Sequence, residues 1–152
     1  MKSPFKSRSD GSVGVRLDDR DRDLLESLPA YVLSKLDTDD GVVRRLFPPA
    51  YTEDPLRQAE YDSIVRSDLV SHHKSSLSVL EDTAHAKNLS ADQAQGWLVA
   101  LNDLRLVLGT QLDVKEETEL PGPDDPTAPL VALYLYLGHL QWELVEALAA
   151  RL

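Results

Sequence analysis

Three side chains near the middle of the chain could bind a metal ion. Asp68 and His72 are four residues apart, and His73 follows directly. Residues four apart share one face of a helix, so a carboxylate and an imidazole at this spacing can ligate one ion. A zinc or iron site needs a third or fourth ligand, and only His85 and His139 remain as further histidines. We therefore favour a surface pair of Asp68 and His72 with His73 at the edge of the core, and keep a metal site as the alternative.

A polar group interrupts a strongly apolar stretch further along the chain. Asn102, Asp103 and Arg105 lie among leucines between residues 97 and 112. Charged side chains in such a setting are partly buried and need partners. Asn102 and Arg105 are three residues apart and share a helix face, so we predict a buried polar network. In it, Arg105 would reach a carboxylate or the carbonyls at a helix end, and an anion or ligand site is the alternative.

A basic and aromatic stretch has the composition of a docking surface. Arg44 and Arg45 are followed by Phe47, two prolines and Tyr51. Arginine and aromatic side chains supply most of the binding energy at protein interfaces. We expect these four residues to contact a protein partner. The alternative is that the aromatic rings only cover the end of a helical bundle.

Proline and capping signals place helices in the first half of the chain. Asp18 or Asp19 can cap a helix whose apolar spacing continues to Leu36, and Pro29 predicts a kink or a restart within it. Asp54 followed by Pro55 is an N-cap with proline at the first helical position, which predicts a helix to about residue 83. The predicted core stripe of this helix consists of Ile64, Val65, Leu69, Leu77 and Leu80.

Two more helices are predicted in the second half. Ser90 and Gln93 form a capping box that begins a helix ending near residue 114. An acidic, proline-rich loop at residues 113–129 separates it from a last helix. Both helices are apolar on nearly every side, which is typical of a buried helix or a dimer interface. Three aromatic residues on the last helix could form either a homodimer seam or part of the core: Tyr134, Tyr136 and Trp142.

Length and composition indicate one globular domain. The chain has 152 residues, of which 42% are hydrophobic and 28% charged. We predict a flexible basic tail over residues 1–12 and a single helical domain over residues 13–152. The net charge of -10 opposes the neutralisation of phosphates, so direct nucleic-acid binding is not expected.

The residue types also exclude several classes of protein. The chain contains no cysteine, which excludes disulfides, thiolate zinc sites and a thiol switch within it. The N-terminal residues lack the apolar run of a secretory signal, so we expect a cytoplasmic protein. The longest uncharged stretch of the last helix is too short for a membrane span, so no membrane association is expected.

Two segments resemble a known family. They are residues 101–110, LNDLRLVLGT, and residues 43–51, VRRLFPPAY. From about residue 13 to 148 the chain resembles an actinobacterial family of domains of unknown function that has been named oxidative-stress regulator AosR. The resemblance implies a cytoplasmic regulator that acts with the transcription machinery through a stress sigma factor. It also implies a link to redox or sulfur metabolism, although a chain without cysteine departs from any thiol-sensing member.

These observations lead to one fold and three candidate functions. We predict a mainly α protein, a bundle of about five helices with a short N-terminal extended or β arm. Its expected role is that of a non-enzymatic regulator or adaptor in oxidative-stress or sulfur-metabolism transcription control, without a cofactor. It would contact a sigma factor or RNA polymerase. The alternatives are a metal- or small-molecule-binding enzyme that uses Asp68, His72 and His73, and a structural homodimer.

Overall fold

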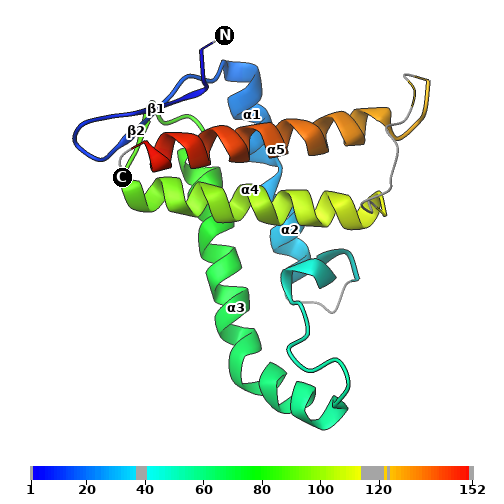
Figure 1. Cartoon of the computed structure of the whole chain (residues 1–152). Coiled ribbons are helices and arrows are strands. Elements are labelled where there is room, and N and C mark those ends of the chain that lie inside the picture. The colour runs from blue at the N-terminus through cyan, green and yellow to red at the C-terminus, as the bar shows by residue number, and fades with distance from the viewer. Residues whose placement is uncertain (1, 37–40, 114–121, 123, 151–152) are drawn as a thin grey trace.

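The predicted mainly α architecture is confirmed. The structure, a computed structural model, describes residues 2–36, 41–113, 122 and 124–150 (Figure 1). Five α-helices and a small three-stranded sheet form most of this part of the chain. None of the helices within the described ranges is long and apolar enough to cross a membrane. The acidic loop predicted at 113–129 falls mainly on residues outside these ranges.

The first two helices begin at the predicted signals. Helix α1 (Asp19–Ser27) is capped by Asp18, whose carboxylate accepts a hydrogen bond of 2.8 Å from the amide of Asp21. Helix α2 (Pro29–Leu36) begins at the proline, which lacks an amide proton and needs no partner at a first helical position. The restart at Pro29 is therefore confirmed.

Helix α3 (Pro55–Thr83) follows a short 3-10 helix, η1 (Gly41–Leu46). As predicted, Asp54 caps it and accepts a hydrogen bond of 3.2 Å from the amide of Arg57. Only its last third is buried, because the first two thirds extend away from the other long helices (Figure 1). The prediction that Ile64 belongs to the core is wrong, since 72% of this residue is exposed.

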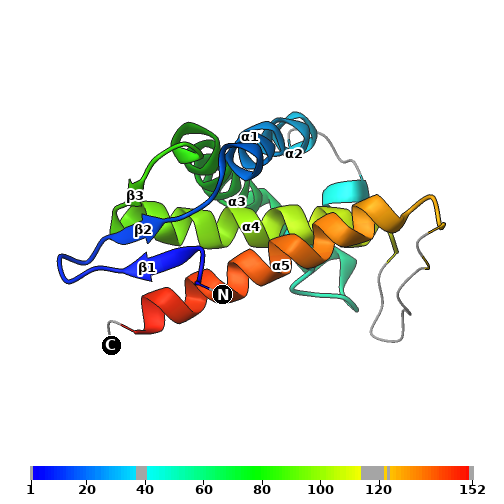
Figure 2. The ribbon, with the colours of Figure 1, turned by 90° about the horizontal axis from the view of Figure 1, so that it is seen from above.

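Helices α4 (Ala91–Gln111) and α5 (Ala128–Ala149) lie side by side and run in opposite directions (Figures 1 and 2). The predicted capping box begins α4, with hydrogen bonds of 2.9 and 3.1 Å between Ser90 and Gln93. Helix α4 is the centre of the bundle, as its apolar surface predicted. Helix α5 buries one face against α4 but leaves Trp142 and other apolar side chains exposed on the opposite face.

The sheet joins the N-terminus to the bundle. Strands β1 (Phe5–Ser7), β2 (Val13–Val15) and β3 (Asn88–Leu89) are antiparallel and lie in that order beside one end of α4 and α5 (Figure 2). The prediction of a flexible tail over residues 1–12 is wrong for β1. The Phe5 ring is buried and packs edge-on against Trp97 at a centroid distance of 6.0 Å, which holds the strand in place.

Candidate functional site

A projecting segment carries two of the four residues predicted to bind a partner. We define the arm as residues 47–72, which comprise the connection after η1 and the first part of α3. The arm extends away from α4 and α5 (Figure 1), and none of its residues is buried. It contains Phe47 and Tyr51 of the predicted docking surface, while Arg44 and Arg45 lie just before it in the last turn of η1.

Local contacts shape the tip of the arm. The Tyr51 and Tyr61 rings meet edge to face at 6.2 Å, and the guanidinium of Arg57 lies 5.6 Å from the Tyr51 ring centre. The Tyr51 amide also donates a hydrogen bond of 2.8 Å to the side chain of Gln58. These contacts hold the connection against α3 without burying it. The result is an exposed aromatic and basic surface with a defined shape.

An aromatic clasp holds the base of the arm. The Phe47 ring packs edge to face against His73 at 5.6 Å, and the Arg66 guanidinium lies 4.3 Å from the centre of the same ring. Both contacts join the end of η1 to α3. Phe47 therefore links η1, which packs on α4, to α3.

His73 connects the clasp to the core. Its Nδ1 lies 2.7 Å from Oδ2 of the buried Asp103 on α4. The hydrogen bond to Asp103 raises the pKa of His73, whereas burial raises the pKa of the Asp103 carboxyl. The folded pair therefore holds a proton more tightly than the two separate side chains do in water. This geometry supports a structural link and leaves His73 turned toward the protein interior.

The three predicted metal ligands are not brought together as a metal site. Asp68 and His72 are exposed, while His73 is engaged with Asp103. Within the described ranges, no group of three or more histidine, aspartate or glutamate side chains is placed to hold a metal ion. Helical spacing alone suggested the cluster, but the third side chain points to a different neighbour.

The predicted network around Arg105 divides into two parts. Asp103 faces α3, whereas Arg105 faces α5 and donates a hydrogen bond of 2.7 Å to the side-chain oxygen of Gln141. Gln141 in turn donates to Asn102 at 3.4 Å, and the guanidinium lies 5.3 Å from the Tyr134 ring centre. The prediction that Arg105 binds a carboxylate or the carbonyls at a helix end is wrong within the described residues. Its hydrogen-bond partner there is the neutral side-chain amide of Gln141. Arg105 Nε is buried and has no hydrogen-bond partner there.

The comparison with known proteins identifies the family. A family model described as a domain of unknown function, DUF2017, matches residues 2–148. The chain belongs to the DUF2017 family. No curated protein and no solved structure matches it. The DUF2017 match covers the arm and the four residues of the predicted docking surface.

In the described part of the DUF2017 chain, Arg22 is a buried cation that the sequence reasoning missed. Arg22 donates hydrogen bonds of 2.6 to 3.2 Å to four backbone carbonyls: Leu17, Ala84, Ala86 and Val15. The guanidinium thereby joins β2 and α1 to the end of α3. The available signal was spacing, since Arg22 precedes Leu25 by three residues and so lies on the buried face of α1. This role is structural, and it lies in the body of the domain, by which we mean the described residues outside the arm.

Proposed function

We propose that this DUF2017 protein is a non-enzymatic adaptor that binds a component of the transcription machinery through the arm. The observation that supports the proposal is the exposure of two large apolar side chains on the projecting helix. Leu56 is 80% exposed and Ile64 is 72% exposed. Neither contributes appreciably to folding, and apolar side chains on a projecting helix are typical of a surface that binds a partner.

The composition of the arm fits a protein partner. Tyr51, Tyr61 and Arg57 at the tip belong to the residue types that supply most binding energy at interfaces. They are held in place by one another, so little conformational entropy is lost when a partner binds. Arg44 is exposed beside the base and extends the same surface. The arm thus offers aromatic, apolar and basic contacts along one continuous segment.

The biological setting of the proposal rests on the resemblance to the AosR family. That resemblance implies a regulator of oxidative-stress or sulfur-metabolism transcription that contacts a stress sigma factor or RNA polymerase. The absence of cysteine means that this chain would not sense oxidants through its own thiols. In our proposal a partner or another signal supplies the redox input, and the chain transmits it by protein contact.

A binding experiment with purified proteins tests the proposal. The full-length chain is titrated with RNA polymerase, with and without a stress sigma factor, and we expect saturable binding. Leu56→Glu combined with Ile64→Glu should weaken it at least about a hundredfold, because the variant places two charges in an apolar contact.

A matched control separates the arm from the rest of the surface. Leu130→Glu introduces one glutamate at an exposed leucine of α5 and should leave the affinity unchanged. Binding that survives the arm variant would contradict the assignment of the arm. A wild-type chain that binds neither form of the polymerase would contradict the transcription role.

A further inference from the structure

Helix α5 carries a second apolar surface that neither the core nor the arm explains. We define the α5 seam as the exposed residues Leu135, His139, Trp142, Glu146 and Ala149. Trp142 is 60% exposed and Leu135 is 50% exposed, and Val145 lies next to them with 45% exposed. Two of the three aromatic residues predicted for a dimer seam face the body instead. Tyr136 donates a hydrogen bond to Asp21, and Tyr134 lies beneath Arg105.

The spacing of the seam is that of a helix that packs along another helix. Its residues follow one another at intervals of four, three, four and three, an average of 3.5 that keeps a stripe facing a partner helix. The stripe is also nearly symmetric about Trp142. Leu135 lies seven residues before it and Ala149 seven after, while His139 and Glu146 lie three before and four after.

We infer that the α5 seam binds the α5 seam of a second copy of this chain, with the two helices antiparallel about a two-fold axis at Trp142. A two-fold interface requires a surface that is complementary to itself. In this arrangement the large Leu135 of one copy meets the small Ala149 of the other. His139 of one copy comes beside Glu146 of the other, where an imidazole N–H can donate a hydrogen bond to the carboxylate.

Charge favours a second copy at this position. The chain carries a net charge of -10, so two copies repel each other across most of their surfaces. Helix α5 has only two formally charged residues, Glu143 and Glu146, among its 22. The seam is therefore a face where two copies meet with little repulsion, and the lack of lysine and arginine on α5 gives an acidic partner no cation to bind.

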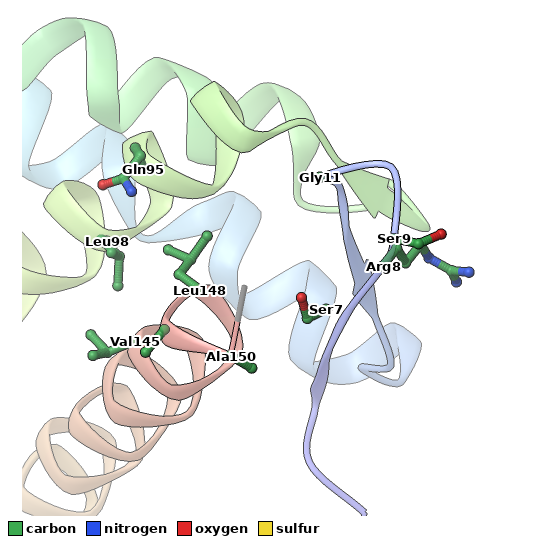
Figure 3. Close-up of a pocket in the computed structure, with 10 residues that line it drawn as sticks. Ser7, Arg8, Ser9, Gly11, Gln95, Leu98, Val145, Leu148 and Ala150 are labelled. Carbon is green, nitrogen blue, oxygen red and sulfur yellow. The ribbon is translucent and has the colours of Figure 1, made fainter. Parts of the chain in front are cut away.

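A neighbouring groove extends the seam. Figure 3 shows Leu98, Val145 and Leu148 gathered where α4 and α5 meet, opposite the β1–β2 hairpin, in a groove of about 1000 Å³. Arg8 on the hairpin points away from these three side chains (Figure 3). A pair of helices alone makes a narrow contact. The groove adds apolar surface beside Val145 and so increases the area that two copies can bury. A stable interface buries roughly 800 Å² per partner.

The oligomeric state of the full-length chain tests the inference first. We expect light scattering after size exclusion, over a wide range of concentrations, to give the mass of a dimer. Trp142→Glu should raise the dimer Kd at least about a hundredfold, because it places two like charges at the axis. At a concentration too low for dimers, its melting temperature should stay near that of wild type, since Trp142 is 60% exposed in the single chain. Leu130→Glu, on another face of α5, is the control that should remain dimeric.

Single cysteines then test the axis, because the natural chain has none. Under oxidation, Trp142→Cys should crosslink to its own copy, since the two residues meet on the axis. Leu135→Cys should not, because the two copies of residue 135 lie about 21 Å apart along the helices. A mixture of Leu135→Cys and Ala149→Cys chains should form the mixed crosslink.

Three results would overturn the inference. The first is a wild-type chain that remains monomeric at the highest concentration. The second is a dimer that Trp142→Glu leaves intact, which would place the interface elsewhere. The third is efficient crosslinking of Leu135→Cys to itself, which would indicate parallel helices. None of these results bears on partner binding by the arm, so the two proposals can fail separately.

Discussion

The two ends of α3 are one continuous helix in two different environments. Near its C-terminal end, Leu77 and Leu80 are completely buried against the bundle. In its N-terminal part, Leu56 and Ile64 are largely exposed. The apolar side chains are of the same kind, so side-chain chemistry does not explain the difference. Packing of the C-terminal part of α3 against the core is enough to fix the helix in place. Its N-terminal part therefore remains accessible to a partner.

The body and the arm are also held by different interactions. The body relies on burial and on the four carbonyl contacts of Arg22. The arm relies on its Asp54 cap, on aromatic contacts at its tip and on the clasp of Phe47 with His73 and Arg66. A helix cap, an aromatic pair and a cation–π contact each contribute about 1 kcal/mol to stability. We therefore expect the arm to open locally at a lower free energy than the body unfolds.

Truncating one apolar side chain in each part of α3 should give the largest contrast. Leu77→Ala leaves a cavity in the core and should lower the free energy of unfolding by about 3 kcal/mol. Ile64→Ala removes an exposed side chain and should change it by less than about 0.5 kcal/mol. Urea denaturation of the two variants provides the measurement. Equal losses would mean that the arm is packed against the body in solution.

Removing the buried guanidinium should have the next largest effect. Arg22→Gln leaves buried carbonyls without their charged donor and should cost about 2 kcal/mol. Arg20→Gln is a matched control two residues earlier, where the side chain is exposed, and should be nearly neutral. Thermal melts of both variants suffice. If Arg20→Gln were the more damaging change, the assignment of Arg22 as the link between β2, α1 and α3 would be wrong.

The smallest predicted effect is a pH dependence of the free energy of unfolding that arises from His73 at the base of the arm. The folded pKa of His73 is raised above its ordinary value of 6.5. Its contribution to stability is therefore fully present below pH 6.5 and is lost as the pH rises through the folded pKa. The raised pKa of Asp103 acts in the same direction, because the folded state again binds the proton more tightly. His73→Gln should remove the His73 part of this dependence.

Melting curves of wild type and His73→Gln at several pH values check this expectation. The stability advantage of wild type should be greatest in acid and should shrink as the pH is raised. A wild-type advantage that grows with pH would have the wrong sign and would contradict the assigned hydrogen bond. The acidic surface also affects stability as the pH changes, so only the difference between the two proteins is informative.

Helix beginnings could be predicted from the sequence because they depend on residues a few positions apart. The Asp18 and Asp54 caps, the restart at Pro29 and the capping box of Ser90 with Gln93 are all satisfied within one turn. The mainly α fold follows from these signals and from the apolar periodicity between them. Arg44, Arg45, Phe47 and Tyr51 remain a predicted docking surface, and the structure places them on and beside the arm.

Only the tertiary structure decided which apolar and polar side chains find partners. Phe5 becomes a strand residue because Trp97, distant in sequence, offers it a buried surface. Asp103 and Arg105 are close in sequence but turn to different helices, α3 and α5. Helical spacing specifies the face on which a residue lies, whereas burial depends on whether another element reaches that face. For Leu56 and Ile64 of the arm and for the outer face of α5, no element in the described part of the chain does.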